Sequence, residues 1–272
     1  GSEMVVLMEN ELNLTIPEKY SGSEIVQKLA IAESSVRISL PPDEYRIRQR
    51  SKRGAERWLE IFKQSPDSTQ FAKDCLRNER SNLRLVEFCA EVLRTRALRN
   101  LNNTEPQVPS ITPSEILEIL MQWAHVSMLK SPPVPSNQAD TEIWPEKLII
   151  RRLAVTLGLV TVETGDASIL MTALKAASKP PRRDPEGLGL RRWLRIWCMV
   201  TSSLPAVVHS HGKSQEISEK FLGIFREYSA GAMGLAARVG EGRREEKLEA
   251  LNSIETWLTY IPSLPPDTLS PP

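Results

Sequence analysis

The strongest candidate for binding chemistry is a run of basic residues near the N-terminus. Positions 46–57 read RIRQRSKRGAER, with five arginines, one lysine and a single acid, Glu56. Residues three or four positions apart lie on one face of an α-helix. The spacing of four, three and four therefore predicts one helical stripe: Arg46, Arg50, Arg53 and Arg57. Arg48 and Lys52 flank this stripe, and the other side carries apolar residues: Ile47, Ala55, Trp58 and Leu59.

Like charges aligned on one helix face repel one another, so a partner or counter-ions are needed to offset the repulsion. Three anionic partners fit this stripe: a nucleic-acid backbone, an acidic protein surface or lipid headgroups. The structural alternative is a solvated face that acidic neighbours neutralise in the folded protein. A nuclear-import signal is a third use of the same composition.

A second group of basic residues lies in the C-terminal half, close to Trp193 and Trp197. If these cations converge in space, they form a basic surface with tryptophan at its edge, as in proteins that bind single-stranded nucleic acid. The alternative is that tryptophans at helical spacing belong to the core. The residues of this predicted secondary basic surface are Arg182, Arg183, Arg191, Arg192 and Arg195.

Catalytic and metal chemistry have weak support in the sequence. His209 and His211 are the only close histidine pair, whereas zinc sites usually have three or four convergent ligands. We expect them in a loop that follows a short helical turn within 205–213, and we expect His125 to be a half-buried packing residue. Phosphate-binding loops, CxxC pairs and GxSxG elbows are absent from the sequence. We therefore predict no catalytic, metal or cofactor site.

The elements that carry these residues are helices. Apolar residues recur at helical intervals along most of the chain, which predicts an all-α fold of about nine or ten helices without a significant sheet. The clearest helix start is Thr112-Pro113-Ser114-Glu115, which fits a capping box. Only 157–164 shows β-branched alternation, and Gly158 is expected to end the helix before it. Starts 20–30 residues apart favour antiparallel helix pairs, arranged as an irregular bundle or a short α-solenoid.

Proline-rich segments suggest how the chain is divided. The segment 131–145 is expected to be a linker between two helical subdomains or a surface loop within one domain. The predicted organisation is an N-terminal segment 1–22, an N-terminal subdomain 23–130, the linker or loop 131–145, a C-terminal subdomain 146–261 and a flexible tail 262–272.

Composition narrows the compartment and the class of protein. The chain has 272 residues with 35 Lys and Arg against 34 Asp and Glu, which disfavours a globally basic nucleic-acid binder. No apolar run approaches the ~20 residues of a membrane-spanning helix. Three cysteines within helical patterns favour reduced thiols. We expect an intracellular protein, cytoplasmic or nuclear, that is neither secreted nor integral to a membrane.

These observations favour a non-enzymatic helical scaffold or adaptor that mediates protein–protein interaction within a larger assembly. The alternative is a viral matrix- or nucleocapsid-type structural protein that binds RNA or an anionic membrane through the helix 46–57. An enzyme with an unrecognised site is the third reading. Protein partners are expected, no small-molecule substrate or cofactor is inferred, and self-association is left open.

Overall fold

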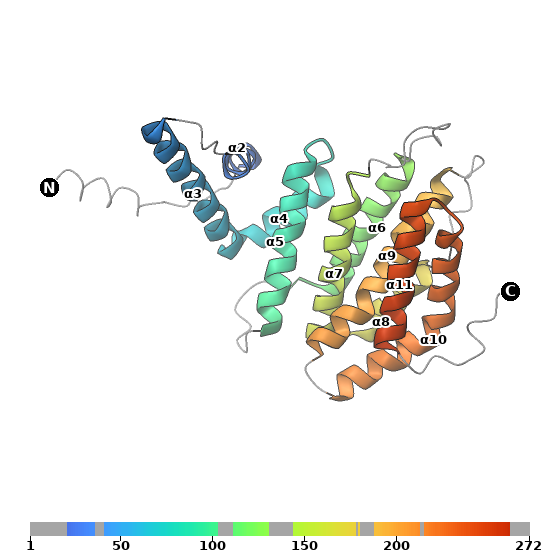
Figure 1. Ribbon diagram of the computed structural model, residues 1–272. Helices are drawn as coiled ribbons and strands as arrows, with labels where there is room; N and C mark the ends of the chain where they lie inside the picture. Colours follow the sequence, from blue (N-terminus) through green and yellow to red (C-terminus); the bar gives the residue numbers. More distant parts are fainter. Residues whose placement is uncertain are drawn as a thin grey trace.

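A computed structural model of the chain confirms the all-α prediction (Figure 1). It describes residues 21–35, 41–102, 111–130, 144–177, 179, 188–212 and 215–261. All regular structure within these ranges is helical. The ten helices described there are α2 (Gly22–Ala32), α3 (Pro42–Gln64), α4 (Asp67–Asn78), α5 (Leu83–Asn102), α6 (Pro113–Leu129), α7 (Lys147–Thr164), α8 (Ala167–Ala177), α9 (Leu188–His211), α10 (Gln215–Gly240) and α11 (Arg244–Tyr260).

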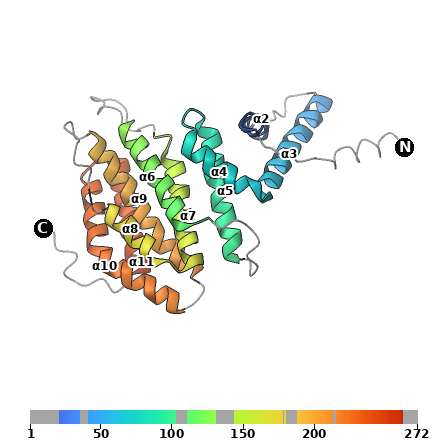
Figure 2. The same ribbon diagram turned by 180° about the vertical axis from the view of Figure 1, so that it is seen from behind.

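The helices stack in sequence order along the molecule. α5, α7, α9 and α11 pack one against the next, while α4 packs on α5, α6 on α7 and α10 on α11. α2 and α3 lie at one end and α10 and α11 at the other, as both ribbon views show (Figures 1 and 2). This order of packing matches the antiparallel pairs and short solenoid that the helix spacing predicts.

One apolar core runs through the stack. It extends from Ile25 in α2 to Ile261 after α11, and its largest fully buried side chains include Trp123, Trp257 and Phe62. The core contains residues from both predicted subdomains. Of the predicted linker, the structure describes only Trp144 and Pro145, and the predicted tail lies outside the described residues. The division at 131–145 therefore stays a prediction.

Two local expectations are wrong. The segment 157–164 is the second half of α7, and Gly158 does not end that helix but lies against Val207 of α9. Likewise, residues 205–211 continue α9 through Pro205 in place of the expected turn and loop. In both cases burial between neighbouring helices keeps a segment helical although its own residues favour another conformation.

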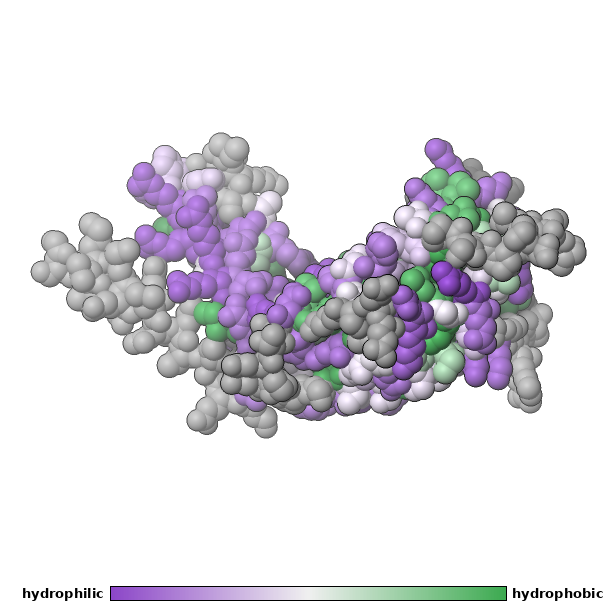
Figure 3. Space-filling model, turned by 90° about the horizontal axis from the view of Figure 1, so that it is seen from below, coloured by the Kyte–Doolittle hydropathy of each residue, from purple (hydrophilic) through white to green (hydrophobic). Residues whose placement is uncertain are grey.

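Seen from below, the molecule has two prominences with a hollow between them (Figure 3). Hydrophilic residues dominate the prominence that carries α2 and α3, whereas apolar residues gather on the side of the C-terminal helices. Among the described residues, no helix combines the length and apolar character required to cross a bilayer.

Candidate functional site

Helix α3 carries the predicted basic stripe and contributes to the core only through its C-terminal part. Its buried residues are Ala55, Trp58, Leu59 and Phe62, so no residue of α3 before position 55 is buried. Ile47, predicted on the apolar side of the helix, is 66% exposed. Ile47 is exposed because the first turns of α3 extend beyond the core, whereas Ala55, Trp58 and Leu59 of the same predicted side are buried.

Aromatic contacts fix the orientation of α3. The rings of Trp58 and Phe62 stack with centroids 5.9 Å apart, and Phe62 lies 5.9 Å from Phe88 of α5. The ammonium of Lys28, on α2, lies 5.8 Å from the Trp58 ring. Such contacts stabilise packed aromatic clusters beyond simple burial. The exposed part of α3 is therefore presented from an ordered base.

The five arginines of the run, Arg46, Arg48, Arg50, Arg53 and Arg57, are exposed, and Lys52 is half-buried. Arg48 pairs with Glu44 at 2.7 Å, and Lys52 Nζ donates to the Ser34 carbonyl at 3.4 Å. Among the described residues, no carboxylate pairs with Arg46, Arg53 or Arg57. Acidic neighbours therefore neutralise Arg48 but leave these three charges available.

Two of the three described residues of the predicted secondary basic surface are buried, whereas the side chain of Arg191 is 42% exposed and pairs with Glu246. Arg192 and Arg195 are 2% and 4% exposed. Trp193 and Trp197 are buried in the core, as the alternative interpretation held. Arg182 and Arg183 lie outside the described residues.

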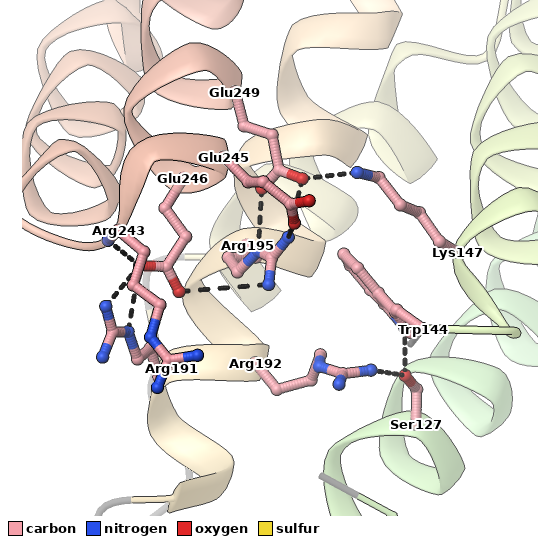
Figure 4. A network of polar contacts seen from close by, with 10 residues as sticks. All are labelled: Ser127, Trp144, Lys147, Arg191, Arg192, Arg195, Arg243, Glu245, Glu246 and Glu249. Carbon is pink, nitrogen blue, oxygen red and sulfur yellow. Dashed lines mark hydrogen bonds and ion pairs between the residues drawn. The ribbon is translucent and has the colours of Figure 1, made fainter. Parts of the chain in front are cut away.

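The buried arginines belong to a polar network between α9 and α11 (Figure 4). Arg195 binds Glu249 through two hydrogen bonds, Nε to Oε2 and Nη2 to Oε1, both 2.8 Å long. Arg191 pairs with Glu246, and Lys147 of α7 pairs with Glu249. Bidentate pairs of this kind are among the stronger charge-assisted contacts in proteins.

Trp144, just before α7, joins the same network. The guanidinium carbons of Arg192 and Arg195 lie 4.6 and 5.1 Å from the Trp144 ring centroid. The indole Nε1 donates to Ser127 Oγ at 2.6 Å, and Arg192 Nη1 donates to the same oxygen at 3.4 Å. The network thereby connects α6, α7, α9 and α11.

The charge state of Glu249 follows from these contacts. Burial raises the pKa of Glu249, but hydrogen bonds from Arg195 and Lys147 lower it, and the pKa ends below its ordinary value. Glu249 is therefore ionised at neutral pH and does not serve as a proton donor there. We interpret the network as a structural connection between helices.

The acidic partners in this network were missed by sequence reasoning. Arg191 and Arg195 are four residues apart on α9, and Glu245 and Glu249 have the same separation on α11. Matching spacing of opposite charges on two helices was the available signal. A pocket of about 250 Å³ beside the network is lined by charges of both signs, among them Arg238 and Glu241.

Where the structure describes the surroundings of the histidines, they do not gather with further metal ligands. His209 lies at the end of α9 with its ring 4.8 Å from that of Tyr260, while His125 is exposed on α6 and not half-buried as expected. Within the described ranges, no group of three or more His, Cys, Asp or Glu side chains is placed to hold a metal ion.

Compared with protein-family models, curated proteins and solved structures, the chain has no significant match.

Proposed function

We propose that the protein is a non-enzymatic helical scaffold that mediates protein–protein interaction, with α3 as the docking element for an acidic partner protein. One observation carries this proposal. The first three arginines of the stripe precede the first buried residue of α3, and Arg46, Arg53 and Arg57 have no acidic partner among the described residues.

The composition of the exposed surface favours a protein partner. Five of its six cations are arginines, and arginine is enriched at protein interfaces whereas lysine is depleted. Ile47 stands between Arg46 and Arg48 in the sequence and is 66% exposed, so it offers an apolar contact that a partner protein can bury. Carboxylates on the partner would form charge-assisted hydrogen bonds with the guanidinium groups.

RNA or an anionic membrane is the second candidate partner, as for a viral matrix- or nucleocapsid-type structural protein. The observation in its favour is the geometry of the row. At 1.5 Å per residue, the stripe from Arg46 to Arg57 extends over roughly 16 Å. A straight row of that length can follow several phosphates of a nucleic-acid backbone or several lipid headgroups.

Three anionic probes separate these candidates. Fluorescence anisotropy at low salt would measure binding to a labelled glutamate-rich peptide and to a single-stranded RNA, and co-sedimentation would measure binding to phosphatidylserine vesicles. The test variant reverses the stripe (R46E, R50E, R53E and R57E). The matched control reverses four exposed cations elsewhere and so makes the same change in net charge (R151E, K220E, R226E and R238E).

We expect the stripe variant to lose affinity for the acidic peptide by about tenfold or more, and the control to bind almost as wild type does. Tighter binding of RNA, with a log–log salt slope near the number of contacted arginines, would favour the second candidate. An equal loss in both variants, with unchanged circular dichroism, would show that net charge and not α3 determines binding. That result, or no binding by the wild type, would contradict the proposal.

A further inference from the structure

The last helix, α11, has an exposed apolar face. Its buried residues, Glu246, Ala250, Ser253 and Trp257, lie on one side, where α11 packs on α9 and α10. On the other side Leu248, Leu251 and Leu258 are 53%, 61% and 45% exposed. Large apolar side chains clustered on a surface typically mark an interaction site.

The exposed residues of this face follow the spacing of a coiled coil. Five of them are separated by four, three, four and three residues, as the a and d positions of a heptad repeat are. We call them the α11 seam: Arg244, Leu248, Leu251, Glu255 and Leu258. Within the described part of the chain, neither Arg244 nor Glu255 forms an ion pair.

The seam is complementary to itself in the antiparallel direction. Arg244 lies four residues before Leu248, and Glu255 lies four residues after Leu251. When two such helices pair antiparallel about the midpoint between the leucines, Leu248 of each faces Leu251 of the other. Arg244 of each then faces Glu255 of the other. The leucine contact and the ion pair each occur twice, as a two-fold interface requires.

We propose that a second copy of this chain docks on the α11 seam to form a symmetric antiparallel dimer. The row of helices α5, α7, α9 and α11 would then continue into α11 of the second copy. Because α3 lies at the opposite end of the molecule, this dimer leaves both basic stripes accessible (Figure 1). The proposal is therefore independent of the partner that α3 binds.

The first test of this dimer is a measurement of the oligomeric state over a range of protein concentrations. In sedimentation velocity, the wild-type mass should rise with concentration from 30.6 kDa towards twice that value. Leu251→Glu should stay monomeric over the same range, because it places two carboxylates in the centre of the interface. Because Leu251 is exposed, the circular dichroism spectrum of this variant should equal that of the wild type. A wild type that remains monomeric throughout, its seam then being covered by something else, would overturn the proposal.

Charge reversal tests the antiparallel register. Arg244→Glu alone and Glu255→Arg alone each place like charges opposite one another twice, so each variant should lose dimerisation. An equimolar mixture of the two should dimerise again, since every facing pair is then Glu with Arg, and the double variant should dimerise by itself. Arg226→Glu, an exposed reversal on α10, is the control and should dimerise as wild type does. Failure of the mixture and the double variant to recover would contradict this arrangement.

Discussion

Gly158 of α7 and Val207 of α9 approach each other more closely than any residue with a side chain would allow. A Cβ atom added at position 158 would lie 2.9 Å from Cγ1 of Val207 and 3.0 Å from its Cβ. Real Cβ atoms show almost no contacts this short. The glycine therefore sets the separation of two central helices of the stack.

Gly158→Ala should destabilise the protein. The valine Cβ is fixed to the backbone, so the helices must move apart, and overpacking of this kind typically costs about 1–3 kcal/mol. Chemical denaturation would measure the free energy of unfolding. Gly223→Ala in α10 is the control, since nothing lies within 4 Å of its added Cβ, and it should stabilise by about 0.5–1 kcal/mol through helix propensity. Equal effects of the two substitutions would rule out a close contact at Gly158.

Glu249 should make part of the stability dependent on pH. Burial raises its pKa and hydrogen bonds from Arg195 and Lys147 lower it, with a net decrease. A lowered folded-state pKa contributes stability that is present above the unfolded value of about 4.3 and is lost as the pH falls through the folded pKa. Glu249→Gln should therefore destabilise at pH 7 by about 1–3 kcal/mol and flatten the stability profile below pH ~4.5.

Chemical denaturation curves, recorded about every half pH unit between pH 3 and 7, would measure the free energy of unfolding as a function of pH. Glu227→Gln, at an exposed position on α10, is the matched control and should reproduce the wild-type profile. If Glu249→Gln were as stable as wild type and kept the same acid dependence, the pair with Arg195 would contribute nothing net.

The three thiols should differ in reactivity. A hydrogen bond from Cys89 lowers the pKa of Cys75, which is half-buried, whereas the same contact and burial raise the pKa of Cys89. Burial raises the pKa of Cys198 to about 11. Because the thiolate is the reactive form, iodoacetamide should label Cys75 first in the folded protein, and mass spectrometry would identify the site. Cys75→Ser should remove the fast reaction; faster labelling of Cys198 would contradict this order.

The local sequence was sufficient to predict those features that depend only on neighbouring residues in the chain. The capping box is confirmed: Thr112 Oγ1 accepts from the amide of Glu115, whose carboxylate accepts from the amide of Thr112. The helical stripe of α3 follows from local spacing in the same way. These signals involve residues within one or two helical turns, so they are readable from the sequence.

Contacts between segments far apart in the sequence determined which charged side chains are buried and how closely the helices pack. Arg192 and Arg195 look like surface cations in the sequence. Only the packing of α9 against its neighbours buries both side chains and gives Arg195 the carboxylate of Glu249 on α11. Gly158 resembles a helix end until Val207, 49 positions away, is placed against it. The sequence alone determined the helices and which faces carry charge. Tertiary structure determined which of those charges are neutralised, because neutralisation and burial depend on residues far apart in the chain.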